Sequence, residues 1–299
     1  MKNARIAAVS ALAPALLALG SCSDDGAGFG RLTLGITDAP VDDATAVVVQ
    51  FTGVEVKPAD GRARSFAFDA PRQIDLLALS GTDSELLLDG VLVPAGRYNW
   101  VRLAVDANED GVADSYIDLE DGSRHELEVP SGDETGLKLI TGFVVPAGGA
   151  ASFTLDFDLR KSVHQPMDAG DSYKLRPTLR IVDNARVGAI AGTVDAALVG
   201  EGCTPAVYVF TGGGVTPDDV DGAEPEPVSS AVPELNVTTG HYDYTVGFLG
   251  EGAYTVSFTC DAGADDPAAD DTLVFIGTQD TSVAAGETTT VNFPPPPPV

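Results

Sequence analysis

Basic residues are scarce in this sequence. The 299 residues include 17 Lys and Arg against 45 Asp and Glu, which gives a formal net charge of -28 at pH 7. A chain with this balance repels phosphate backbones, so nucleic acid is not an expected partner, whereas solubility and cation binding are favoured. The hydrophobic content of 44% is sufficient for packed cores, which excludes an acidic disordered polymer.

Motifs of catalysis and cofactor binding are also lacking. The histidines, His125, His164 and His241, have no second histidine at a metal-ligand spacing. The sequence contains no His-Glu-x-x-His, no Gly-x-Ser-x-Gly elbow, no phosphate-binding loop and no dinucleotide fingerprint. We therefore expect a protein that is not an enzyme.

Helical periodicity is absent as well. No stretch keeps a helical period of about 3.6 residues over three turns. Apolar residues instead alternate over short runs such as 97–105 and 152–159, and turn residues separate these runs at close spacing. Many short strands joined by turns predict an all-β fold with two β-sandwich domains in series.

The N-terminus carries a predicted targeting segment. Lys2 and Arg5 precede an apolar run over residues 6–19, and residues 19–22 are Leu-Gly-Ser-Cys. This arrangement resembles the bacterial lipobox, in which the cysteine becomes a lipid-modified N-terminus. The resemblance implies acyl chains such as palmitate on Cys22 and a membrane as partner. An ordinary secretory signal with a chance cysteine is the alternative.

The residues around this cysteine bear on localisation. By resemblance to the sorting rule of such lipoproteins, Ser23 in place of Asp implies the cell outer membrane. We therefore expect a lipid-anchored protein of the bacterial cell envelope. Lipidation of Cys22 leaves Cys203 and Cys260, which we expect to form a disulfide bond in that oxidising compartment.

Landmarks in the first half of the chain resemble one known family. The strongest match is Leu-Asp-Phe-Asp-Leu-Arg-Lys-Ser-Val at 155–163, and further matching segments stand at 34–42, 54–56, 94–98 and 130–132. In this order they resemble the domain of unknown function 4382, a family of uncharacterised bacterial secreted domains. The resemblance implies a β-sandwich over residues 29–184 and carries no known activity.

The second half resembles a different family. Segments at 240–244, 252–256 and 285–291 are similar to the transthyretin-like, carboxypeptidase-regulatory-like β-sandwich. This resemblance implies a domain over residues 187–293, of a type that serves as a stalk or accessory module. The remaining predicted parts are a signal peptide (1–21), a tether (22–28) and a polyproline tail (294–299).

Residues 106–114 form the sharpest candidate metal motif. Asp106, Asn108, Asp110 and Asp114 stand at positions 1, 3, 5 and 9 of a calcium loop of the EF-hand type, with glycine at position 6. Position 12 is isoleucine where the motif requires Glu. A weak calcium site and a bare acidic turn therefore remain two open interpretations, and calcium is the one cofactor suggested.

Two acidic loops of the second half show no ligand pattern. Aspartates cluster at residues 218–221 and 265–271, but their spacing fits no fixed set of metal ligands. We therefore expect both to be solvated surface loops.

The segment over residues 152–164 begins as a core strand. Phe153, Leu155, Phe157 and Leu159 alternate with polar residues, so one face of the strand is apolar. We expect these four side chains to be buried between sheets.

The same segment carries a predicted structural polar cluster, which consists of Asp156, Asp158, Arg160 and Lys161. Paired carboxylates can perform acid–base chemistry on a glycan, but the nearby cations should keep both carboxylates ionised, which suits a structural role better. The two cations are too close in sequence to fold back along one strand, so arginines on other strands are the expected partners. The candidates are Arg102, Arg176 and Arg180.

Together these features predict a lipid-anchored cell-envelope protein with a non-enzymatic binding, display or structural role. Its expected partners are the membrane, through the lipid on Cys22, and an unknown protein or glycan at the cell surface. Two alternatives remain. One is a calcium-dependent adhesion or glycan-binding module, and the other is a secreted glycan-acting enzyme that uses the paired carboxylates.

Overall fold

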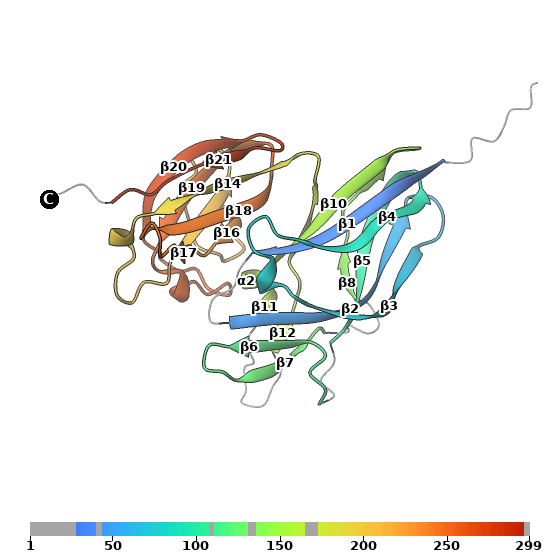
Figure 1. The fold of residues 1–299 in the computed structure, drawn as a ribbon, viewed down its shortest axis with the longest axis horizontal. Coiled ribbons are helices and arrows are strands. Elements are labelled where there is room, and N and C mark those ends of the chain that lie inside the picture. Colours follow the sequence, from blue (N-terminus) through green and yellow to red (C-terminus); the bar gives the residue numbers. More distant parts are fainter. Residues whose placement is uncertain (1–27, 40–43, 108–110, 131–135, 165–172, 296–299) are drawn as a thin grey trace, which may run out of the picture.

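The computed structural model describes residues 28–39, 44–107, 111–130, 136–164 and 173–295. Strands dominate these ranges and form two β-sandwich domains in series, which confirms the predicted all-β class (Figure 1). The predicted signal peptide and the lipidation site at Cys22 lie outside the described residues. In the described ranges, no helix has the length and apolar character that crossing a membrane requires.

The first domain contains two sheets. The smaller has the strand order β13-β10-β1-β4, in which β1 and β10 pair in parallel. Its strands are β1 (Phe29–Ala39), β4 (Glu85–Pro94), β10 (Ala150–Asp158) and β13 (Leu179–Asp183). The larger sheet has the order β11-β12-β7-β6-β2-β5-β8, with β3 beside β2 and β9 beside β5. Its strands are β2 (Ala44–Pro58), β3 (Arg64–Asp75), β5 (Gly96–Asp106), β6 (Tyr116–Leu119), β7 (Arg124–Glu128), β8 (Leu137–Leu139), β9 (Phe143–Val145), β11 (Val163–His164) and β12 (Tyr173–Leu175).

The second domain contains two four-stranded sheets, ordered β17-β18-β14-β21 and β16-β15-β19-β20. The strands of the first are β14 (Val187–Val194), β17 (Glu234–Leu235), β18 (Tyr242–Gly250) and β21 (Thr288–Thr290). Those of the second are β15 (Ala206–Thr211), β16 (Pro227–Ala231), β19 (Gly252–Thr259) and β20 (Phe275–Val283).

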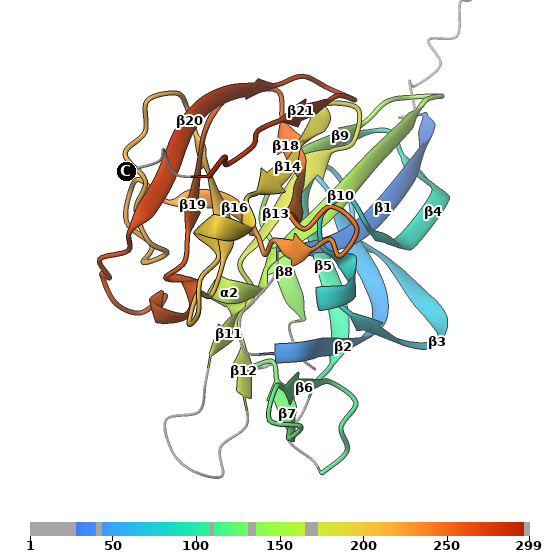
Figure 2. The same cartoon turned by 60° about the vertical axis from the view of Figure 1, so that its left-hand side comes forward.

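Short helical segments connect these sheets. The described ones are η1 (Leu77–Leu79), α2 (Leu159–Ser162), η2 (Ala196–Leu198) and η3 (Ala262–Ala264). The four-residue helix α2 lies between the two domains in both views (Figure 1, Figure 2). The start of β1 and the second domain lie on opposite sides of the molecule (Figure 1). Each domain has its own hydrophobic core, so the contact between them is a separate feature of the fold.

Strand β10 is central in the smaller sheet of the first domain, between β1 and β13. Leu155, Phe157 and Leu159 are fully buried and Phe153 is 7% exposed, which confirms the predicted core face. The opposite face is buried too, because Asp156 is only 6% exposed. A carboxylate removed from water in this way requires a partner, and the site described below supplies one.

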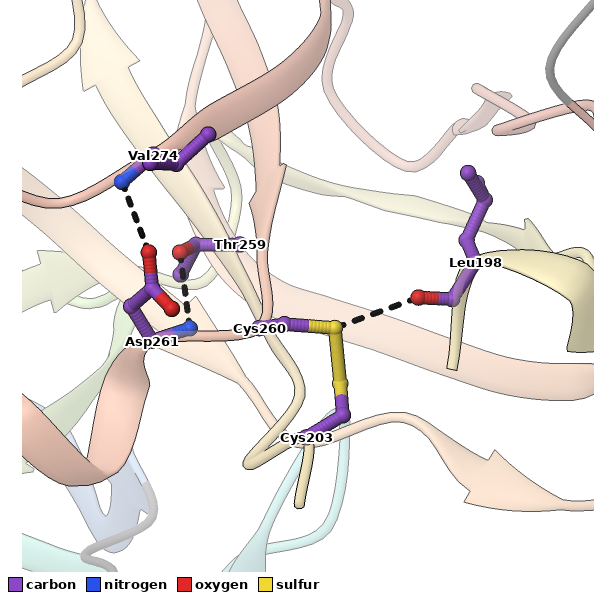
Figure 3. Close-up of a disulfide and its surroundings, with 6 residues drawn as sticks. All are labelled: Leu198, Cys203, Thr259, Cys260, Asp261 and Val274. Carbon is purple, nitrogen blue, oxygen red and sulfur yellow. Dashed lines mark hydrogen bonds between the residues drawn. A yellow bond between two sulfur atoms is a disulfide. The ribbon is translucent and has the colours of Figure 1, made fainter. Parts of the chain in front are cut away.

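The expected disulfide bond joins Cys203 to Cys260, whose Cα atoms are 4.6 Å apart (Figure 3). Cys260 Sγ contacts the carbonyl oxygen of Leu198 at 3.1 Å (Figure 3). The side chain of the next residue, Asp261, accepts a hydrogen bond of 2.9 Å from the backbone N–H of Val274 (Figure 3). The bridge spans a sequence separation of 57 residues. In the chain-entropy model, closing a loop of this length stabilises the fold by about 4 kcal/mol.

We expect Phe157→Ala to lower the free energy of unfolding by about 3–5 kcal/mol, because it leaves a cavity where a fully buried ring packs. Ile140→Ala is the matched control, since Ile140 is 75% exposed and its truncation should cost less than about 0.5 kcal/mol. Denaturant unfolding followed by fluorescence measures both, because Trp100, the single tryptophan, lies on β5 of the same domain. Equal effects of the two variants would contradict the assignment of β10 to the core.

Candidate functional site

Strand β10 ends in a helical turn because Asp158 caps it. The Asp158 carboxylate accepts a hydrogen bond of 3.2 Å from the backbone N–H of Lys161, and Ser162 Oγ donates back to the Asp158 carbonyl. The turn also brings Lys161 Nζ to 3.3 Å from Asp158 Oδ2. The prediction that neighbouring cations cannot reach these carboxylates is therefore wrong for Lys161, because residues three apart share a face of a helix.

The same turn directs Arg160 out of the first domain and into the second. Its side chain is 4% exposed. Nη1 donates to the hydroxyl of Tyr208 on β15 and lies 3.3 Å from Asp265 Oδ2. It also lies 3.5 Å from the carbonyl oxygen of Ala262. The guanidinium carbon is 5.3 Å from the centre of the Tyr208 ring, within the range of a cation–π contact.

The carboxylate that receives Arg160 is held from several sides. The Tyr208 hydroxyl donates to Asp265 Oδ2, and the backbone N–H of Val220 donates to Asp265 Oδ1 over 3.1 Å. Burial raises the pKa of the Asp265 carboxyl, while the hydrogen bond from Tyr208 and the charge of Arg160 act in the opposite direction. Arg160, Tyr208 and Asp265 thus form a buried polar contact between the domains, which we call the Arg160 lock.

Two further contacts flank the Arg160 lock. Lys161 Nζ pairs with Glu226 and donates to the carbonyl oxygen of Pro227 over 3.2 Å, so the adjacent cation also reaches the second domain. Elsewhere between the domains, the loop before β4 packs on β18. A Cβ at Gly247 would stand 2.1 Å from the carbonyl oxygen of Gly81, so the close approach of these backbones requires glycine at 247.

Asp156 has a partner on the neighbouring strand. Arg180 of β13 stands opposite it in the antiparallel register, and Arg180 Nε donates to Asp156 Oδ2 over 2.6 Å. Of the candidate arginines, Arg102 instead pairs with Glu55 on β2. Burial raises the pKa of the Asp156 carboxyl, although the charge and hydrogen bond of Arg180 lower it in part. Arg180 is thus the candidate arginine that the structure places as the cationic partner of Asp156.

The paired carboxylates line a small cavity of about 210 Å³ between the domains, together with Lys161 and Arg180. Sites for small-molecule ligands usually measure about 300–1,000 Å³. Asp156 is paired with Arg180 and Asp158 is committed to the turn of α2. Acid–base catalysis on a glycan needs an open site and a carboxyl that is not committed to the fold, so this arrangement suits a structural role.

The predicted calcium loop is described only in part, because Asn108 and Asp110 lie outside the described residues. Asp106 ends β5, where its Oδ2 accepts a hydrogen bond of 3.4 Å from Gln50 and its carbonyl oxygen accepts one of 2.6 Å from Ser115. Asp114 is partly buried, and its carbonyl oxygen accepts a hydrogen bond of 2.9 Å from Gln73 of β3. Calcium binding at this loop stays a prediction.

The acidic loops of the second domain are not simply solvated, which corrects the expectation from their sequence. Asp219 is 1% exposed and the side chain of Asp265 is fully buried. The reason is the apolar residue between the aspartates, Val220, which packs in a small core beside Tyr208 and Phe210 and draws its loop inward. Val220, an apolar residue within a run of aspartates, is the feature of the sequence that indicates this burial.

A larger groove of about 480 Å³ separates the domains beside the loop before β4. It is lined by Thr45, Thr82 and Asp83 of the first domain and by Glu234 and Asp243 of the second, among others. Its volume falls in the usual range for ligand sites, and its position at a domain boundary is typical of them.

We expect Arg160→Met to lower the free energy of unfolding by about 3–5 kcal/mol, because it leaves the Asp265 charge buried without its cation. The double variant Arg160→Met with Asp265→Asn should recover part of this loss, since no uncompensated charge remains. Arg124→Met is the control, because Arg124 pairs with Asp118 on an exposed surface where ion pairs contribute little. If Arg160→Met costs no more than this control in denaturant unfolding, the Arg160 lock is not a stabilising contact.

Asp156 should make stability depend on pH with a defined sign. A carboxyl whose pKa is raised above its ordinary value of 3.8 holds its proton more tightly when folded, so its contribution to stability falls as the pH rises through that raised pKa. Asp156→Asn lacks this titration. The stability of the wild type relative to this variant, measured by urea unfolding, should therefore decline as the pH rises from the ordinary value of 3.8 through the raised pKa. Asp118→Asn is the control with the opposite sign, because Arg124 lowers the pKa of Asp118.

No curated protein sequence matches the chain. Similar solved structures include a leucine-rich repeat protein from Bacteroides thetaiotaomicron VPI-5482, with 14% identity and a TM-score of 0.23 over 89% of this chain and 26% of that protein. The minor pilin GBS52 of Streptococcus agalactiae has 12% identity and a TM-score of 0.19, over 89% and 98% of the two chains. The fimbrial anchor protein Mfa2 of Porphyromonas gingivalis has 10% identity and a TM-score of 0.20, over 85% and 99%.

The chain thus spans about a quarter of the length of the first of these proteins, and TM-scores this low carry no argument about function. The family comparison is more specific. Residues 29–177 match the family model described as domain of unknown function (DUF4382), which confirms the family that the motifs of the first domain predict.

Proposed function

We propose that this protein is a lipid-anchored component of the bacterial cell envelope that holds two β-sandwiches as one rigid unit for a non-enzymatic display or binding role. The observation that carries this proposal is the Arg160 lock, in which a buried arginine of the first domain is held by Tyr208 and Asp265 of the second. Separating the domains would leave the charges of Arg160 and Asp265 without each other, and breaking a buried ion pair is costly, so this contact favours a fixed arrangement.

The direction of the chain supports display away from a membrane. The predicted lipid on Cys22 and the tether that follows it precede β1 in the sequence, and the start of β1 lies on the opposite side of the molecule from the second domain (Figure 1). An anchor at this position would hold the first domain near the bilayer and the second domain farther out. That order suits the accessory role implied by the transthyretin-like resemblance, and Ser23 favours the outer membrane.

The groove between the domains is the surface that best suits a bound partner. A rigid interface keeps its two walls at a constant separation, which lowers the cost of ordering the site when a ligand binds. Its hydroxyl and carboxylate side chains suit a ligand rich in hydroxyl groups, which favours a glycan over an anionic partner. Calcium-dependent adhesion through residues 106–114 remains the alternative.

We expect metabolic labelling with a palmitate analogue to mark the wild type and to place it in the membrane fraction, because an acylated cysteine anchors a protein without a spanning helix. Cys22→Ala should lose the label and be released. The double variant Cys203→Ser, Cys260→Ser is the matched control and should keep the label, since its cysteines form the disulfide. Labelled Cys22→Ala protein, or a wild type without label, would refute the anchoring.

A further inference from the structure

Five aspartates from two loops of the second domain converge beside the Arg160 lock. The loops are residues 212–226, between β15 and β16, and residues 260–274, between β19 and β20. Ligand oxygens of Asp219, Asp221 and Asp270 lie within 4.8 Å of one another, and so do those of Asp219, Asp265 and Asp271. Asp219 belongs to both groups and is therefore the centre of the cluster.

The burial and hydrogen bonding of Asp219 indicate that this cluster binds a ligand. The residue is 1% exposed. Oδ2 accepts a hydrogen bond of 2.5 Å from the backbone N–H of Asp271, whereas Oδ1 is buried and has no hydrogen-bond partner. A carboxylate oxygen removed from water without a hydrogen-bond partner is costly, and neighbouring carboxylates add to that cost. The cation that enters from the first domain, Arg160, is bonded to Asp265.

We propose that this Asp219 cluster binds a calcium ion. Its ligands are hard carboxylate oxygens, which suit Ca²⁺ or Mg²⁺ and disfavour metals that prefer nitrogen or sulfur. Oxygens within 4.8 Å of one another can surround a single ion at the Ca²⁺–oxygen distance of about 2.3–2.6 Å. The ligands come from two irregular loops, and Ca²⁺ accepts such irregular geometry, whereas Mg²⁺ requires a near-ideal octahedron.

The ion would act on the contact between the domains. Asp265 and Ala262 of the second loop receive Arg160, and the backbone N–H of Val220 in the first loop donates to Asp265. Joining the two loops through Asp219 fixes the pocket that Arg160 enters. Calcium thus strengthens the Arg160 lock without contacting the first domain.

The experiment uses the full chain, treated with EDTA and then titrated with CaCl₂ by calorimetry, with thermal unfolding measured in parallel. Calcium should bind with a Kd of about 10⁻⁶–10⁻³ M. At about 100 times Kd it should raise the Tm by several degrees. Asp219→Asn should weaken this binding at least about tenfold, because it removes the central charged ligand. Asp114→Asn is the matched control for the other candidate loop and should leave this binding unchanged.

A reversal of stability distinguishes a metal site from a structural acidic cluster. In EDTA, Asp219→Asn should unfold at the same or a higher temperature than the wild type, because it removes a buried charge. In calcium, the wild type should be the more stable. The proposal is overturned if the wild-type Tm does not respond to calcium, or if Asp219→Asn binds calcium as the wild type does. Should this variant fail to fold, Asp270→Asn at an exposed position of the cluster carries the same test.

Discussion

The guanidinium of Arg160 belongs by sequence to the first domain and by environment to the second. Removing an arginine from water is costly, and the cost is offset only where acceptors are held in place around it. Tyr208 and Asp265 supply these acceptors, and each of them is itself fixed, Tyr208 on a central strand and Asp265 by a backbone N–H. The acceptors around Arg160 Nη1 therefore come from the second domain.

This requirement explains local features that otherwise look unrelated. Strand β10 ends at Asp158, where the capped helical turn α2 begins. This turn directs Arg160 and Lys161 away from their own sheet. Asp156 pairs with Arg180 of the neighbouring strand, which leaves Arg160 and Lys161 to contact the second domain. Asp219 lies below the surface because Val220, the next residue, packs inward beside Tyr208 and Phe210. A chain with few cations places two of them, side by side, where two domains meet.

Much of the fold is predictable from the sequence, because it depends on local patterns. The alternation of Phe153, Leu155, Phe157 and Leu159 identified a buried face, and three cysteines with one assigned to lipid left a single disulfide pairing. The contacts of the candidate site were harder to predict from the sequence. The contact between Arg160 and Asp265 joins residues 105 positions apart, and no local period reports such a pair. The Lys161–Asp158 pair was not predicted, because the cations were expected to be too close in sequence to fold back, whereas the chain turns into the helix α2 at Leu159. The match to the family model extends only to residue 177, so it gives no information on the partners of Arg160 in the second domain.

The rigid docking of the two domains is the central claim, and residual dipolar couplings of backbone amides test it most directly. Couplings from residues 29–183 and 187–293 of the isotopically labelled chain are fitted separately. A locked interface predicts that both domains share one alignment tensor, with the same magnitude and the relative orientation seen in Figure 1. Two tensors of different magnitude would show that the domains move independently, and that the buried Arg160 contact does not hold them together.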